Sequence, residues 1–260
     1  MASRLERFRD YRSKLGTRCG VRWFALQALN SRGRIRGPVS VQPALLRHPI
    51  ELRMQSSSDP DVFSQIFLRR EYDFIQGLGA LRTVVDLGAN IGLASAVFLS
   101  RWEHALVLAV EPDPSSYGLL CRNLAPYGDR VQCLHGAAWA SSGELELSHS
   151  FGDGREWATA VHERTGGGER VRAFGMGELL ERVRGERIDL LKIDIEGSER
   201  ALFRADTSWL EHVRHLCIEL HGEECEQAFR AGMRGFVWEE ARHGEYTVCR
   251  NLRRVRPRPR

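Results

Sequence analysis

From Leu81 onwards, short apolar segments alternate with segments of helical character, and this alternation restricts the fold more than any other feature. Strands that alternate with helices build a parallel sheet with helices on both faces. The expected strands are 83–88, 105–111, 130–138, 143–149, 169–174, 188–197 and 213–221, and the expected helices are 92–102, 114–125, 177–185 and 198–205.

The end of the chain adds an antiparallel element. Segments 236–240 and 245–251 are separated by a turn at His243-Gly244 and predict a hairpin at the sheet edge. The fold class is therefore α/β, with a mostly parallel seven-stranded sheet that ends in this hairpin.

The 260 residues suffice for one large domain with an appendage. We expect a basic appendage over 1–55, made of helix or loop and a small β-element. The main domain is expected over 56–251 and opens with a helix near 56–79, and an Arg/Pro-rich tail over 252–260 is expected to be disordered. The glycine-rich segment 151–170 predicts a surface loop that acts as a lid.

Charge is unevenly distributed along the chain. Residues 1–36 carry a net charge of +8 and residues 250–260 carry six arginines, so the middle holds −10 within a total of +4. Solvated termini are the simplest interpretation. The alternatives are contact with nucleic acid, an anionic surface or a second subunit in a homo-oligomer. No apolar run is long enough to span a bilayer and no apolar signal segment is present, so we expect a soluble, cytoplasmic protein.

Two strand ends have the features of a cofactor site. The first strand leads into "DLGANIG", with Asp86, Gly88, Asn90 and Gly92, and the second ends in Glu111. Ligands of open parallel sheets bind beyond the carboxyl ends of the strands, where glycines let the backbone approach them. Glu111 is placed to accept both hydroxyls of a ribose. The G-x-G-x-x-G of nicotinamide-binding proteins is absent, and Asp86 suits the positive amino-acid end of S-adenosylmethionine.

Charged residues interrupt the apolar strand 188–197. Lys192, Asp194 and Glu196 occupy alternate positions, so their side chains share one face of the strand. Apart from Lys14, every other Lys/Arg position is arginine, which makes a lysine inside a core strand informative. His221 ends the next predicted strand and joins these residues as a candidate for proton transfer.

Four segments occur in the order of a known family. "VVDLGANIG", "VEPDP", "LLKIDIEGSE" and "IELH" resemble the FkbM-type methyltransferases, and the resemblance covers roughly Ser56 to Asn251. It implies a Rossmann-like class I fold and transfer of a methyl group from S-adenosylmethionine to an oxygen, often a hydroxyl of a sugar, glycan or secondary metabolite. The chain departs from the family near Gly177, where an aspartate is usual.

The resemblance also implies roles for individual residues. Asp86, Gly88, Asn90 and Gly92 are expected to hold the amino-acid end of the cofactor, and Glu111 with the adjoining Pro112 its ribose. Asp113 and the turn Gly136, Ala137 and Ala138 are expected to border the adenine, with Tyr72 closing over the cofactor. Asp194, Glu196 and His221 are the candidate bases, and Lys192 is expected to keep a carboxylate ionised or to stabilise the oxyanion.

Simpler interpretations stay open for the catalytic candidates. Lys192 and Asp194 could form a structural ion pair, Glu196 could cap the following helix, and His221 could be a polar residue at a helix start. Asp194, Glu196 and His221 could also bind a divalent metal, a less favoured alternative.

Three other functions remain open at this point. One is a nicotinamide-dependent oxidoreductase on a similar sheet, which the missing third glycine disfavours. Another is a nucleic-acid methyltransferase or binder that uses the arginine-rich ends, disfavoured because no N/D-P-P-Y/F motif is present. The last is a fold without catalytic activity.

Overall fold

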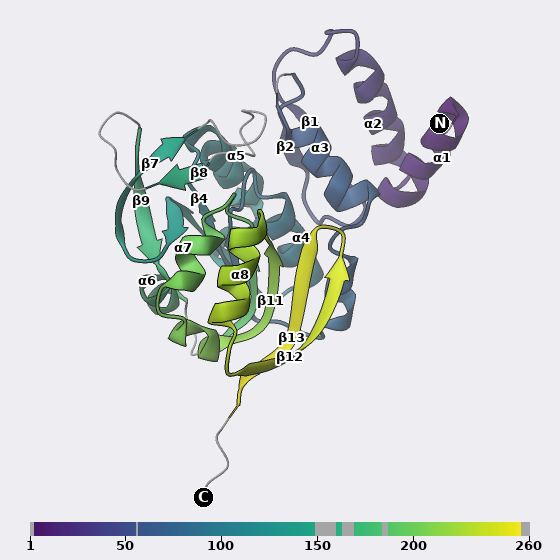
Figure 1. Ribbon diagram of the computed structural model, residues 1–260. Helices are drawn as coiled ribbons and strands as arrows, with labels where there is room; N and C mark the ends of the chain where they lie inside the picture. The colour runs from purple at the N-terminus through teal and green to yellow at the C-terminus, as the bar shows by residue number, and fades with distance from the viewer. Residues whose placement is uncertain (1–2, 56, 149–159, 163–168, 184–186, 256–260) are drawn as a thin grey trace, which may run out of the picture.

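A seven-stranded sheet forms the centre of the protein in the computed structural model, which describes residues 3–55, 57–148, 160–162, 169–183 and 187–255 (Figure 1). Its strand order is β12-β13-β11-β10-β3-β4-β5. The strands are β3 Thr83–Leu87, β4 Leu106–Glu111, β5 Val131–His135, β10 Ile188–Ile193, β11 Val213–Glu219, β12 Phe236–His243 and β13 Tyr246–Arg254. β13 runs opposite to the other six strands of this sheet, so its pairings with β11 and β12 are antiparallel and the others are parallel. The predicted fold class and closing hairpin are confirmed, with β13 inserted between β11 and β12.

Side-chain alternation along the strands divides the core into two clusters on opposite faces of the sheet. Val84 and Leu190 belong to one cluster, whereas their chain neighbours Val85 and Leu191 belong to the other. Helices contribute to both clusters: α4 Leu93–Arg101 and α5 Pro114–Leu124 to the first, and α6 Met176–Arg182, α7 Glu199–Arg204 and α8 Glu223–Gly232 to the second. Helices on both faces leave the carboxyl ends of the strands available for a ligand.

Helix α8 was not predicted, although its sequence carries a helical signal. Cys225, Ala228 and Phe229 are buried at helical spacing, and the rest of the helix is largely charged.

The segment predicted as one strand over 130–138 is divided between two sheets, so this prediction was wrong. β5 ends at His135, and β6 Ala137–Trp139 joins a four-stranded sheet of order β6-β9-β7-β8. The other strands of this sheet are β9 Arg170–Gly175, β7 Gly143–Ser148 and β8 Ala160–His162. The break falls at Gly136, where a Cβ would lie 2.4 Å from the Phe174 ring, so only glycine permits the close approach.

The helix predicted over 56–79 is broken, which corrects a second expectation. The segment contains α3 Asp59–Phe63, a π-helical stretch Ser64–Leu68 and a 3₁₀-helix Asp73–Gly77, with Arg70 at φ 59° between the last two. Residues 66–68, 72, 74 and 75 are all buried, and a continuous helix would turn part of this set to solvent. The change of helix type brings Tyr72 to the sheet.

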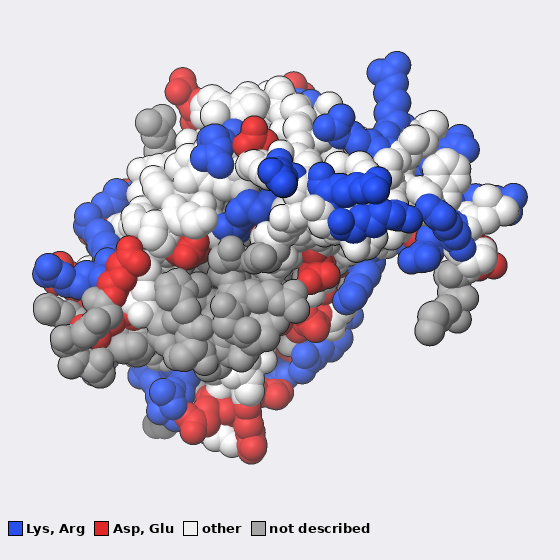
Figure 2. All heavy atoms as spheres, turned by 90° about the horizontal axis from the view of Figure 1, so that it is seen from above, with Lys and Arg blue, Asp and Glu red and all other residues white. Residues whose placement is uncertain are grey.

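The basic N-terminal segment packs onto the main core. α1 Arg4–Leu15 and α2 Thr17–Asn30 form a helical hairpin, and β1 Val39–Val41 pairs antiparallel with β2 Ile50–Leu52, the small β-element that was predicted. Leu15 and Trp23 are fully buried and share the first cluster with Phe63. Basic side chains gather on the side of these helices (Figure 2).

Some expectations concern residues outside the described part. Within 151–170 the structure describes β8 and residues 169–170, and the remaining positions of the predicted lid lie outside the described residues, as do 256–260 of the predicted tail. No helix among the described residues has the length and apolarity that a bilayer crossing requires.

Candidate active site

A cavity of about 510 Å³ opens at the carboxyl ends of the central strands. The predicted site residues that line it are Tyr72, Gly88, Asn90, Glu111, Pro112, Gly136, Ala137, Ala138, Lys192, Asp194, Glu196 and His221. Three other predicted residues lie behind its wall: Asp86, Gly92 and Asp113. Gly92 is the N-cap of α4, and a Cβ there would lie 2.8 Å from the Leu120 side chain. The Asp113 carboxylate caps α5 by accepting from the Ser116 N–H at 2.7 Å.

The turn after β3 depends on glycine because it meets the end of β10. Gly88 is at φ 75°, and a Cβ there would lie 1.7 Å from the carbonyl oxygen of Asp194. The next turn of chain places Asn90 at φ 50°, with its N–H directed at Glu111 Oε2 at 2.8 Å. The Gly88 turn therefore joins the ends of three strands into one wall of the cavity.

Glu111 is held by the backbone on both carboxylate oxygens. Oε2 accepts from Asn90 N–H, and Oε1 accepts from Asp113 N–H at 2.9 Å. Burial raises the pKa of Glu111 to about 7, against the effect of these two N–H groups. The carboxylate thus has a fixed orientation at the cavity edge, and its charge depends on pH near neutrality.

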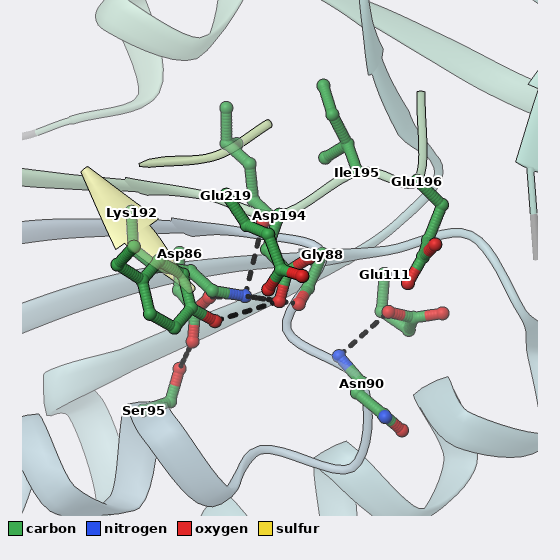
Figure 3. Close-up of polar contacts among 12 residues, drawn as sticks. Asp86, Gly88, Asn90, Ser95, Glu111, Lys192, Asp194, Ile195, Glu196 and Glu219 are labelled. Atoms are coloured by element: carbon green, nitrogen blue, oxygen red, sulfur yellow. Dashed lines mark hydrogen bonds and ion pairs between the residues drawn. The ribbon is translucent and has the colours of Figure 1, made fainter. Parts of the chain in front are cut away.

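Lys192 connects the buried Asp86 to the cavity (Figure 3). Its Nζ donates to the Gly88 carbonyl at 2.7 Å and lies 3.2 Å from Asp86 Oδ1 and 3.4 Å from Asp194 Oδ2. Asp86 is fully buried and also accepts from the Ser95 hydroxyl at 2.7 Å. Although burial opposes its charge, the Asp86 and Asp194 carboxylates raise the pKa of Lys192 well above the ordinary value. Asp86 therefore acts on the cavity through Lys192 and the Gly88 turn.

Two tyrosines from distant segments fix the Asp194 carboxylate. The Tyr246 hydroxyl donates to Asp194 Oδ2 at 2.9 Å, and the Tyr72 hydroxyl donates to that of Tyr246 at 3.0 Å. Both rings are buried, and burial raises the pKa of each phenol well above its usual value. With Oδ2 held by Tyr246 and Lys192, Oδ1 is the oxygen that faces His221, 3.9 Å from its Nε2.

His221 lies among four carboxylates. Its Nδ1 is 3.0 Å from Oε1 of the fully buried Glu199, and its Nε2 is 3.5 Å from both Glu196 and Glu219. Glu199 Oε1 also accepts from the Ile195 N–H at 3.1 Å, so the carboxylate fixes the ring and the turn together. His221 is therefore an oriented part of the site and not merely a polar residue at a helix start.

Burial and neighbouring charges shift the pKa values in this cluster. Burial, followed by the Asp194 charge, raises the pKa of Glu196 to about 7 and that of Glu219 to about 8. Burial opposes the charge of His221, but the hydrogen bond and charge of Glu199 raise its pKa to about 10. A positive charge at Nε2 is thus strongly favoured by its surroundings.

Sequence reasoning assigned no role to Glu199 or Tyr246. Glu199 is the last residue of the segment "LLKIDIEGSE" that carries the family resemblance, so the motif itself contained a signal. Tyr246 contacts a residue 52 positions away and follows an ordinary turn, and nothing in the sequence marked it. Glu71 and Glu245 also line the cavity.

Comparison with known proteins gives a consistent result. The sequence profile of the family described as "Methyltransferase FkbM domain" matches residues 86–246, more than half of the chain. The chain is 31% identical over 191 residues to "Methyltransferase sdnD" of Sordaria araneosa, covering 61% of this chain and 73% of that protein. It is 27% identical over 137 residues to "Hexuronic acid methyltransferase AglP" of Haloferax volcanii, covering 52% of this chain and about half, 54%, of the relative.

Solved structures resemble the chain more distantly. A putative rRNA-methylase from Clostridium thermocellum aligns with a TM-score of 0.44 and 12% identity, over 73% of this chain and 96% of that one.

Proposed function

Because this chain belongs to the FkbM family of S-adenosylmethionine-dependent methyltransferases, we propose that it methylates a hydroxyl oxygen of a sugar, a glycan or a secondary metabolite. Family membership removes the oxidoreductase alternative. The observation that carries the proposal is the cavity itself, where the Gly88 turn and Glu111 face the ionisable groups of Asp194, Glu196 and His221. A cofactor on one side and a hydroxyl acceptor on the other would then share one enclosed space.

The cofactor is proposed to lie over the ends of β3 and β4. Glu111 accepts the ribose hydroxyls, and the apolar turn Gly136 to Ala138 borders the adenine. The Gly88 and Asn90 turn receives the amino-acid end. Asp86 is fully buried and does not line the cavity, so its proposed role is to hold Lys192 against the carbonyl of Gly88.

Methyl transfer is an in-line displacement at the methyl carbon. A lone pair of the acceptor oxygen forms the new C–O bond while the sulfonium sulfur takes the electron pair of the breaking C–S bond. Holding the two atoms in line at about 3 Å supplies much of the acceleration. The acceptor hydroxyl loses its proton to a carboxylate of the Asp194 and Glu196 pair, and a positioned base is worth about 10²–10⁴-fold.

The lining charges restrict the acceptor. Six carboxylates line the described part of the cavity, and only Lys192 and His221 offer cationic groups; the six are Glu71, Glu111, Asp194, Glu196, Glu219 and Glu245. Like-charge repulsion in such a site disfavours an anionic acceptor. We therefore propose a neutral polyol or sugar, in contrast to the acidic sugar in the name of the Haloferax volcanii relative.

Two measurements test the proposal. Calorimetric titration is expected to give saturable binding of S-adenosylmethionine and none of NADH. Transfer of labelled methyl groups to neutral glycosides, uronic acid glycosides and RNA then identifies the acceptor class. Incorporation into RNA alone would overturn the hydroxyl acceptors proposed here, and absence of S-adenosylmethionine binding would overturn the activity.

A further inference from the structure

Three ligand-type atoms converge at the acceptor end of the cavity. One atom each from Asp194, Glu219 and His221 lies within 4.8 Å of the other two, and all three residues are only partly exposed. His221 Nε2 is 3.5 Å from Glu219 Oε1 and 3.9 Å from Asp194 Oδ1. Both distances are longer than the donor–acceptor distance of a good hydrogen bond. Two ligands about 2.2–2.4 Å from a cation and 90–110° apart are roughly 3.1–3.9 Å from each other.

Neighbouring residues fix the orientation of His221 and Asp194 in the way that outer residues orient metal ligands. A ligating histidine normally donates its second N–H to a carboxylate, which leaves the other nitrogen for the metal. Glu199 Oε1 occupies that position at 3.0 Å from His221 Nδ1. Tyr246 and Lys192 hold Oδ2 of Asp194 in the same way and leave Oδ1 directed at His221.

A separate feature also points to a ligand. The Ser198 side chain is 3% exposed, lines the same cavity and has no hydrogen-bond partner for its Oγ among the described residues. A buried hydroxyl is normally satisfied, so an unpartnered one in a cavity wall indicates a polar occupant.

We propose that Asp194, Glu219 and His221 bind a divalent cation with mixed oxygen and nitrogen preference, such as Mn²⁺. Two carboxylates and one imidazole on one side of an ion leave its remaining positions open for water or substrate. The cation would displace the proton from His221 Nε2 and would itself offset the repulsion among the carboxylates. This site was not favoured from the sequence, which named Glu196 in place of Glu219.

The inference deepens the proposed function and rests on it for its catalytic consequence. The open positions accept the acceptor hydroxyl, and the cation lowers the pKa of that hydroxyl. The released proton passes to Glu196, whose carboxylate lies 3.5 Å from His221 Nε2. The oxygen lone pair then forms the C–O bond as the C–S pair returns to sulfur.

Metal binding is tested directly with the full chain after removal of metals by EDTA. Titration with Mn²⁺, followed by calorimetry and by the loss of its free electron-spin resonance signal, is expected to give one saturable site in the absence of S-adenosylmethionine. Glu219→Gln and His221→Gln are each expected to lower the affinity for Mn²⁺ at least tenfold. Glu245→Gln, which removes one carboxylate from the lining of the same cavity, is expected to change the affinity for Mn²⁺ less than threefold.

Affinity for S-adenosylmethionine separates the outcomes. It is expected to stay within threefold in all three variants, which shows that they are folded and that the cofactor proposal stands by itself. Absence of a saturable Mn²⁺ site in the parent protein would overturn the metal site and leave the methyltransferase proposal intact. An equal loss of Mn²⁺ affinity in Glu219→Gln and Glu245→Gln would also overturn the metal site. General attraction to the negative charge of the cavity would then explain the binding.

Discussion

The two halves of the cavity are assembled differently. We name the cofactor half and the acceptor half after the ligands that we propose for them. The cofactor half is local in the sequence, since the Gly88 turn and Glu111 follow adjacent strands β3 and β4. The acceptor half brings together Asp194, His221, Tyr246 and Tyr72 from four separate segments. The first half therefore depends on short sequence motifs, whereas the second depends on how the C-terminal hairpin and the broken helical segment 59–77, here the lead-in segment, pack together. The two halves meet at Gly88, where an added Cβ would lie 1.7 Å from the carbonyl oxygen of Asp194.

Asp194→Asn tests the separation of the halves most severely. The substitution keeps the shape of the side chain but removes its charge, whether that charge serves as base or as ligand. Turnover is expected to fall by about 10²–10⁴-fold, while affinity for S-adenosylmethionine stays within a few-fold. Methyl-transfer kinetics and calorimetry measure the two quantities. Unchanged turnover would remove Asp194 from the mechanism.

Lys192→Met is expected to damage both halves at once, because Lys192 neutralises the fully buried Asp86 and also contacts Gly88 and Asp194. Leaving a buried charge unpaired costs about 3–5 kcal/mol. The free energy of unfolding, measured by urea denaturation, should fall by this amount. The double variant Asp86→Asn with Lys192→Met should recover part of the loss. No recovery would mean that the pair is not the source of the stability.

The depth of Asp86 shows what the sequence could and could not predict. The order of segments identified the fold, and Lys192, Asp194 and Glu196 all line the cavity. The predicted strand 188–197 was too long, because β10 ends at Ile193 and Glu196 lies in the following turn at φ 52°. Alternation does not say how far a side chain lies from the sheet edge, so Asp86 was expected at the ligand and lies behind Lys192. Tyr246 shows the other limit, because a hydrogen bond across 52 residues depends on tertiary packing alone.

A pH titration isolates the cofactor half. Burial raises the pKa of Glu111 to about 7, so this residue is mostly protonated below pH 7 and ionised above it. A carboxylate accepts two ribose hydroxyls better than a carboxylic acid does. Affinity for S-adenosylmethionine is therefore expected to rise with pH and to fall by up to about tenfold per unit below pH 7. Glu111→Gln should bind S-adenosylmethionine more weakly than the parent protein at pH 8 and should lack this pH dependence. Identical pH profiles of affinity in the two proteins would remove Glu111 from cofactor binding.

Tyr246→Phe and Tyr72→Phe give the finest test, since they remove one hydroxyl each from the same hydrogen-bonded chain. Tyr246 contacts the Asp194 carboxylate directly, whereas Tyr72 contacts only the Tyr246 hydroxyl in that chain. A hydrogen bond to a charged group is worth about 1.5–3 kcal/mol, and one between neutral groups about 0.5–1.5 kcal/mol. Turnover should therefore fall about tenfold or more for Tyr246→Phe and only a few-fold for Tyr72→Phe, with cofactor affinity unchanged in both. An equal loss in the two variants would show that they act by packing the lead-in segment against β13 and not by orienting Asp194.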